Sequence, residues 1–189
     1  MNIFGPIIAG IWIAFWLYWA VSALRNRSRF KRSQSRASML LLILALIAVW
    51  AIFADLLPAG LLEEQVIPAG LPAGLAGISI TILGLGFAVW ARVSLGRNWS
   101  VRPGIREGHS LIRTGPYRIV RNPIYTGLLV GYAGTAIVIG VLWAFLLVLL
   151  LLAAFLGKIR EEERFLLEEF GEAYEQYRRE VRALIPFLL

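Results

Sequence analysis

The residues best suited to chemistry gather in one polar stretch, from His109 to Gly127. This stretch holds the only histidine of the chain, together with three arginines, two tyrosines and several Gly and Pro residues. It leads into 34 residues without a charge, Ile124 to Gly157. A polar, motif-like segment beside so long an apolar run predicts a site at the face of a membrane.

A second polar stretch follows the apolar run, from Glu162 to Tyr177, and begins with two glutamates. Apolar residues then recur at steps of three or four, as on one face of a helix. They are Leu166, Phe170, Tyr174, Tyr177, Val181 and Leu184. We expect one charged helix from Lys158 to Arg182, in which this stripe serves packing rather than the site.

The polar residues of both stretches each have two interpretations. Arg121 could grip a substrate carboxylate with its guanidinium, or anchor the chain at the membrane interface. Pro123 could simply begin a helix, or leave free amides there that bind a cofactor carboxylate. Tyr117 and Tyr125 suit ligand contacts and interface positions alike. Glu161–Glu163 could bind a ligand, or form a solvated first turn favoured by the helix dipole.

Together the two stretches resemble the isoprenylcysteine carboxyl methyltransferase family and, more loosely, the phospholipid N-methyltransferases. That family has His-x-Leu, then Gly-x-Tyr and Arg-His-Pro-x-Tyr-x-Gly, an apolar hairpin, and finally Glu-Glu-x-x-Leu with Phe-Gly-x-x-Tyr-x-x-Tyr. The matching positions are His109/Leu111, Gly115/Tyr117, Arg121 to Gly127, Glu162/Glu163/Leu166 and Phe170/Gly171/Tyr174/Tyr177. The resemblance covers residues 109–186.

The sequence departs from the family pattern at Asn122, where the family usually has histidine. Asparagine can still orient a cofactor through hydrogen bonds, but it cannot titrate near neutral pH. A proton-transfer role for this position is therefore not expected.

The resemblance implies methyl transfer from S-adenosylmethionine to a lipophilic or prenylated acceptor, most like carboxyl methylation of a prenylcysteine. In-line displacement at a sulfonium methyl asks the protein mainly for positioning and a dry pocket. The resemblance implies Arg121 and Tyr125 as catalytic residues, and no metal. The cofactor-binding residues that it implies are His109, Leu111, Gly115, Tyr117, Asn122, Pro123, Gly127, Glu162 and Glu163. The glutamates would hold hydroxyl or ammonium groups of the cofactor.

Composition predicts an all-α, polytopic integral membrane protein with about five transmembrane helices. Of its 189 residues, 59% are hydrophobic and 16% charged, against about a quarter charged in soluble domains. We expect spans at residues 3–24, 38–57 and 73–91, and a hairpin over 124–157 that turns near Gly140. One straight helix over the hairpin would be about 51 Å long, too long for a bilayer, so we expect two helices of about 17 residues each.

Basic residues predict the orientation of these spans. All nineteen Lys and Arg fall in residues 25–36, 92–121 and 158–182, whereas 58–72 and the turn near Gly140 have none. The positive-inside rule then places the N-terminus outside and the C-terminal helix in the cytoplasm, at a prokaryotic inner or plasma membrane. Basic residues that punctuate apolar runs do not predict nucleic-acid binding. With no cysteine and one histidine, a thiolate or histidine metal centre is not expected either.

We expect a single domain whose polar parts meet at the cytoplasmic face. It divides into three N-terminal spans at 1–95, a cofactor segment at 96–123, the hairpin at 124–157, and a cytoplasmic helix and tail at 158–189. Membrane lipids are the expected surroundings, and the sequence leaves the oligomeric state open.

Other functions fit parts of this pattern. A phospholipid or small-molecule N- or S-methyltransferase is the nearest alternative. A nicotinamide-dependent membrane reductase is more distant, as is a non-enzymatic membrane scaffold or transporter subunit. No Gly-x-Gly-x-x-Gly follows a predicted strand, which disfavours the reductase. No predicted span has an ionisable residue at its middle, which disfavours a transporter.

Overall fold

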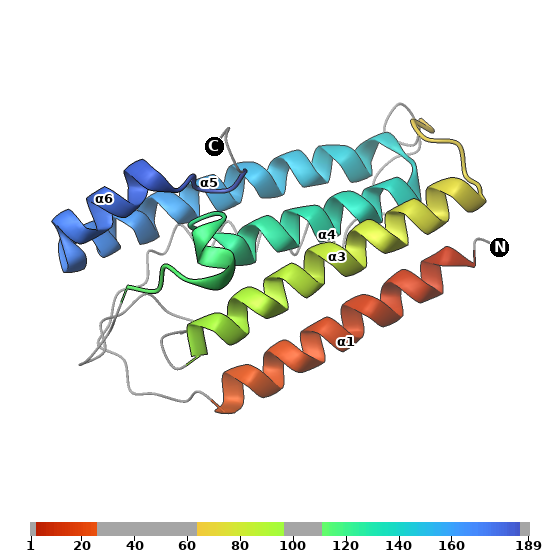
Figure 1. Cartoon of the computed structure of the whole chain (residues 1–189). Coiled ribbons are helices and arrows are strands. Elements are labelled where there is room, and N and C mark those ends of the chain that lie inside the picture. Colours follow the sequence, from red (N-terminus) through yellow and green to blue (C-terminus); the bar gives the residue numbers. More distant parts are fainter. Residues whose placement is uncertain (1–2, 26–63, 97–110, 186–189) are drawn as a thin grey trace.

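A computed structural model describes residues 3–25, 64–96 and 111–185, and these residues are helical with short connections (Figure 1). The described helices confirm the all-α class. They are α1 (Phe4–Arg25), α3 (Leu71–Leu95), the short 3-10 helix η3 (Gly115–Arg118), α4 (Pro123–Ile139), α5 (Leu142–Phe170) and α6 (Glu172–Glu180).

Three of these helices are long and apolar enough to cross a membrane: Phe4–Leu24 in α1, and the whole of α3 and α5. Helix α4 is apolar but has only 17 residues. The expected spans at 3–24 and 73–91 match α1 and α3 closely. The span expected at 38–57 lies outside the described residues.

Glycines bring α3 and α4 into backbone contact. A Cβ on Gly84 would stand 2.5 Å from the amide nitrogen of Gly131, and a Cβ on Gly134 would stand 2.6 Å from the carbonyl oxygen of Gly77. Glycines at these positions let the two main chains approach more closely than larger residues would permit. The Thr81 hydroxyl lies in the same seam, 3.2 Å from the carbonyl oxygen of Gly131. These two helices therefore form the close-packed centre of the fold.

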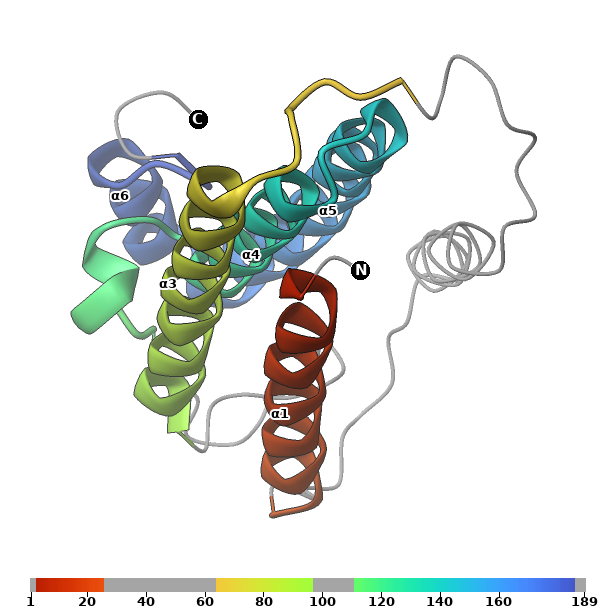
Figure 2. The ribbon, with the colours of Figure 1, turned by 90° about the vertical axis from the view of Figure 1, so that its right-hand side faces the viewer.

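Helix α1 lies along α3 and also reaches α4 (Figures 1 and 2). Its Trp12 donates a hydrogen bond from Nε1 to Oγ1 of Thr135 at 3.0 Å, and its ring lies 4.4 Å from that of Tyr132. Nearer the C-terminal end of α1, Arg92 of α3 donates to the carbonyl oxygen of Ser22 at 3.3 Å. Aromatic and polar contacts thus hold α1 at its middle and near its C-terminal end.

The hairpin turns at Gly140, as expected. Gly140 adopts a left-handed conformation with φ of 75°, which glycine tolerates without steric cost. Its carbonyl oxygen accepts hydrogen bonds from the amides of Val66 and Ile67, and Leu142 donates to Glu64. The two connections without basic residues therefore meet at one end of the bundle, opposite α6 (Figure 1).

The expected ends of the hairpin and tail helices are wrong. Helix α5 has 29 residues and continues past Lys158 to Phe170, instead of ending after about 17 residues. At Lys158 the sequence changes from apolar to polar, but the helix continues because the following Glu, Arg and Leu residues are good helix formers. The break falls at Gly171, with φ of 49°, after which α6 turns back along the end of α5. The tail is therefore two helices, not one.

Candidate functional site

The site begins where the first polar stretch, residues 109–127 and called the first motif below, meets the segment that follows α6. Val120 and Arg182 form a parallel β-bridge. The Arg121 amide donates to the carbonyl oxygen of Arg182 at 2.7 Å, and the Asn122 amide donates to that of Ala183 at 3.0 Å. Residues about sixty positions apart in the chain are thus held side by side at the start of α4.

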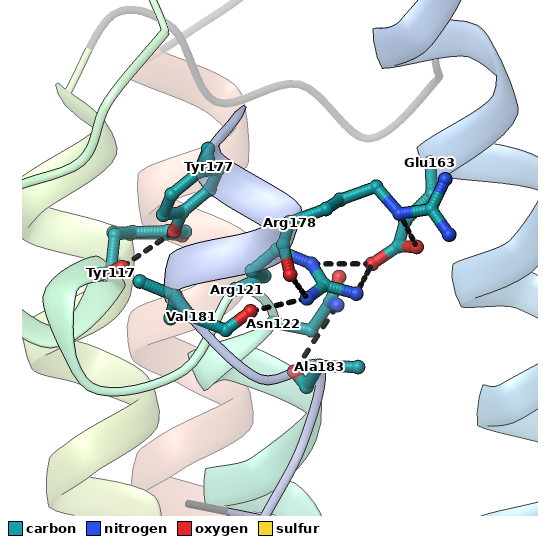
Figure 3. A network of polar contacts seen from close by, with 8 residues as sticks. All are labelled: Tyr117, Arg121, Asn122, Glu163, Tyr177, Arg178, Val181 and Ala183. Atoms are coloured by element: carbon teal, nitrogen blue, oxygen red, sulfur yellow. Dashed lines mark hydrogen bonds and ion pairs between the residues drawn. The ribbon is translucent and has the colours of Figure 1, made fainter. Parts of the chain in front are cut away.

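Arg121 forms a buried ion pair with Glu163 of α5 (Figure 3). Its Nε and Nη2 lie 2.8 and 2.7 Å from Oε1 of Glu163, and the two side chains are only 9% and 12% exposed. Nη1 donates to the carbonyl oxygens of Arg178, at 3.2 Å, and of Val181. Because protein atoms occupy its guanidinium, Arg121 could grip a substrate carboxylate only if this ion pair opened. Its burial also excludes a simple interfacial anchor.

Glu163 has a second basic partner. Nε of Arg178, on α6, lies 3.7 Å from Oε2 of Glu163, and the Arg178 side chain is 44% exposed (Figure 3). The carboxylate therefore joins a residue that precedes α4 to a residue of α6. An ion pair this well buried is costly to break on one side only.

Glu162, the next residue along α5, faces a different set of partners. Its Oε1 accepts a hydrogen bond from the Tyr125 hydroxyl at 2.9 Å and lies 3.4 Å from Nζ of Lys158. The ring of Tyr125 packs on Phe155, with 5.0 Å between centroids. The two adjacent carboxylates thus have separate environments, one facing α6 and one facing α4.

Tyr117 and Tyr177 join η3 to α6. The Tyr177 hydroxyl donates to the carbonyl oxygen of Tyr117 at 2.5 Å (Figure 3). The guanidinium of Arg113 lies 5.2 Å from the Tyr177 ring and also pairs with Glu180. Burial raises the pKa of Tyr177 to about 12, although Arg121 and Arg113 oppose the shift. Burial likewise raises the pKa of Tyr117. Both phenols are therefore protonated near neutral pH.

The other residues predicted from the sequence are placed as follows. The Asn122 side chain donates to the carbonyl oxygen of Ala183 at 3.2 Å. Pro123 is buried at the first position of α4. Gly115 opens η3 beside Ser94 and Trp90 of α3. Leu111 is half-buried, and His109 lies outside the described residues.

Gly127 lies apart from these side chains. A Cβ there would stand 2.5 Å from the carbonyl oxygen of Gly84 on α3. Close packing of α4 on α3 accounts for this glycine without a cofactor contact.

The structure overturns the helix-dipole interpretation of the glutamates. Glu161–Glu163 lie in the second half of α5, not in a first turn, so the positive end of a helix does not account for them. The expected packing role of Tyr174 and Tyr177 is confirmed, because both are 2% exposed or less.

Sequence reasoning missed three basic residues of the site. Lys158 precedes its partner Glu162 by four positions, a helical spacing that could have identified it. Arg113 and Arg178 gave no comparable signal. Their partners lie on other elements and come near only because α6 turns back at Gly171.

Known proteins are similar to this chain. A family model described as phospholipid methyltransferase matches residues 73–173. The chain is 36% identical over 101 residues to protein-S-isoprenylcysteine O-methyltransferase of Schizosaccharomyces pombe, which covers 52% of this chain and 43% of that protein. It is 33% identical over 115 residues to a protein of Oryza sativa subsp. indica named "Probable protein-S-isoprenylcysteine O-methyltransferase", covering 59% and 60%.

One solved structure is also similar, that of a eukaryotic intramembrane Ras methyltransferase, isoprenylcysteine carboxyl methyltransferase. The TM-score is 0.57 at 25% identity, over 83% of this chain and 55% of that chain. The chain spans less than two thirds of the length of each of these relatives. It is an integral multi-pass membrane protein that belongs to the phospholipid methyltransferase family, with isoprenylcysteine O-methyltransferases among its relatives.

Proposed function

We propose that this chain transfers a methyl group from S-adenosylmethionine to the carboxyl group of a prenylcysteine-type or other lipophilic acceptor, at the membrane–cytosol interface. One observation carries the proposal. Arg121 of the first motif contacts Glu163 of the second polar stretch, residues 162–177, and Tyr125 contacts Glu162. The partners are 42 and 37 residues apart in the chain. Two motifs that pair in this way form one site rather than two surface features.

The residues around Glu162 fit the polar parts of S-adenosylmethionine, which supplies a methyl group on a sulfonium centre. The cofactor carries an ammonium group and ribose hydroxyls, all hydrogen-bond donors. Tyr125 and Lys158 both contact Oε1 of Glu162, and a carboxylate can accept hydrogen bonds at each oxygen. Glu162 would therefore hold a donor of the cofactor. Tyr125 would fix the carboxylate, and Phe155 behind the phenol would limit access of water.

The remaining contacts proposed for the cofactor come from the first motif. Leu111, Gly115, Tyr117, Asn122 and Pro123 lie on the chain between α3 and the start of α4. His109 belongs to the same proposal.

Two acceptor classes have support. The names of the curated relatives favour a prenylcysteine carboxylate. The family model, described as phospholipid methyltransferase, makes a phospholipid amine the second candidate. A carboxylate attacks a sulfonium methyl as an anion, whereas an ammonium must first lose a proton. The carboxylate needs no such proton acceptor, and the curated relatives are named for this acceptor, so we favour the acid.

The cofactor proposal predicts binding of S-adenosylmethionine and not of NADPH in calorimetric titrations of purified protein. Glu162→Ala should weaken S-adenosylmethionine binding by roughly 1.5–3 kcal/mol, about tenfold or more, because a charge-assisted hydrogen bond is lost. Arg164→Ala serves as the control, because Arg164 lies two residues away on α5, pairs with Glu168 and has a side chain that is 84% exposed. Binding of NADPH alone would support a reductase, and unchanged affinity in Glu162→Ala would remove Glu162 from the site.

We further propose five spans, with the N-terminus outside and α6 in the cytoplasm. The distribution of basic residues supports this orientation. The native chain has no cysteine, so single cysteines report the side of the membrane. In intact cells, an impermeant maleimide should label Gln65→Cys and leave Glu175→Cys unlabelled until the cells are opened. Both native positions are exposed. The reverse pattern would invert the topology.

A further inference from the structure

The Arg121 guanidinium contacts the end of α6. Its Nη1 donates to the carbonyl oxygens of Arg178 and Val181, which belong to the last turn of α6 and its C-cap. The last carbonyls of a helix have no partner within the helix and carry partial negative charge. A cation placed there both satisfies them and complements the helix dipole. Arg121 therefore caps the C-terminal end of α6.

Glu163 holds the same arginine from the opposite side. Its Oε1 contacts Nε and Nη2 of Arg121, and its Oε2 faces Arg178 on α6. One buried carboxylate on α5 thus connects two arginines, one before α4 and one on α6 (Figure 3). A neutral residue in its place would leave the buried Arg121 charge without its counterion.

The segment that follows α6 lies on the start of α4. Leu184 is fully buried, and its carbonyl oxygen accepts a hydrogen bond from the Thr126 hydroxyl at 2.8 Å. The carbonyl oxygen of Ala183 accepts hydrogen bonds from both the backbone amide and the side-chain amide of Asn122. Whatever holds α6 in place therefore also fixes the turn of α4 that carries Tyr125.

We propose that Arg121 and Glu163 are positioning residues that form a latch, holding α6 and residues 181–184 against the start of α4. Part of this inference rests on the proposed methyltransferase function, because the latch would act on the reaction through Tyr125 and Glu162. Neither latch residue need touch the acceptor. The latch itself is a property of the fold and can be measured without cofactor.

Accessibility of the buried segment reports the latch directly. In a Leu184→Cys chain, a water-soluble maleimide should react slowly in detergent. Adding Glu163→Gln should raise the labelling rate at least tenfold, because the counterion of Arg121 is lost. Arg121→Lys should do the same, because lysine keeps the charge but lacks the planar fork whose separate nitrogens reach Glu163 and the two carbonyls. Arg179→Ala is the matched control, since Arg179 lies on α6 in an exposed pair with Glu175. A rate unchanged in both latch variants would overturn the proposal.

A second readout avoids the buried cysteine. Trypsin cleavage after Arg182, followed by mass spectrometry, should accelerate in Glu163→Gln and not in Arg179→Ala. Cleavage as slow as in the parent chain would also contradict the latch.

Kinetics then separate positioning from direct contact with the acceptor. A latch predicts that Glu163→Gln and Arg121→Lys raise the KM for S-adenosylmethionine at least tenfold and lower kcat less, because bound cofactor restores the docked arrangement. A fall in kcat larger than the rise in KM would assign Arg121 to the acceptor instead. If the chain binds no S-adenosylmethionine, the proposed function fails, while labelling and cleavage still decide the latch.

Discussion

Replacing Gly84 by alanine should destabilise the bundle, whereas the same replacement at Gly86, two residues further along α3, should stabilise it slightly. The added Cβ at Gly84 would lie 2.5 Å from the amide nitrogen of Gly131 and 2.7 Å from the carbonyl oxygen of Gly127. These are backbone atoms, which cannot rotate away, so α3 and α4 must separate. Overpacking of this kind costs about 1–3 kcal/mol and occasionally more, a large part of a total stability of about 5–15 kcal/mol.

Gly86 provides a control of the same chemistry on the same helix. A Cβ there has no atom within 4 Å, and alanine in a helix is about 0.5–1 kcal/mol more favourable than glycine. Thermal unfolding followed by circular dichroism in detergent should therefore show a lower Tm for Gly84→Ala and an equal or higher Tm for Gly86→Ala. Equal shifts in the two variants would mean that α3 and α4 are not in backbone contact.

The helical core could be predicted from the sequence because it follows from local patterns. Long apolar runs specify α1 and α3, and the first lies within one residue of its expected start and end. The turn at Gly140 follows from the length of the apolar run between charged segments. Hydropathy failed at the end of α5, because it marks where polarity changes and not where a helix ends. That helix ends at Gly171, which has a positive φ of 49°.

The sequence motifs name candidate site residues, but they do not predict which of these residues pair with one another. The family motifs point to Arg121, Tyr125, Glu162 and Glu163, and these four are in contact in pairs. Nothing in the spacing shows which glutamate faces which partner, because that depends on the rotation of α5. Nor does spacing show that Arg121 caps α6, since that contact needs the reversal at Gly171.

A prenylcysteine acid should accept the methyl group, and the corresponding amide should accept none detectably. The carboxylate has an anionic oxygen that can attack the sulfonium methyl and displace the neutral thioether, whereas the amide nitrogen is a poor nucleophile. Both compounds carry the same lipid chain but differ in charge, so methyl transfer is compared at equal concentrations of membrane-bound acceptor. A difference between them therefore reports chemistry at the acceptor and not access to the site.

The most direct test is transfer of labelled methyl from S-adenosylmethionine, by purified protein in liposomes, to three acceptors measured side by side. They are prenylcysteine acid, its amide and phosphatidylethanolamine, with Glu162→Ala protein as the enzyme control. We expect label on the acid, none on the amide, and a strongly reduced rate with Glu162→Ala. Label on phosphatidylethanolamine and none on the acid would contradict carboxyl methylation.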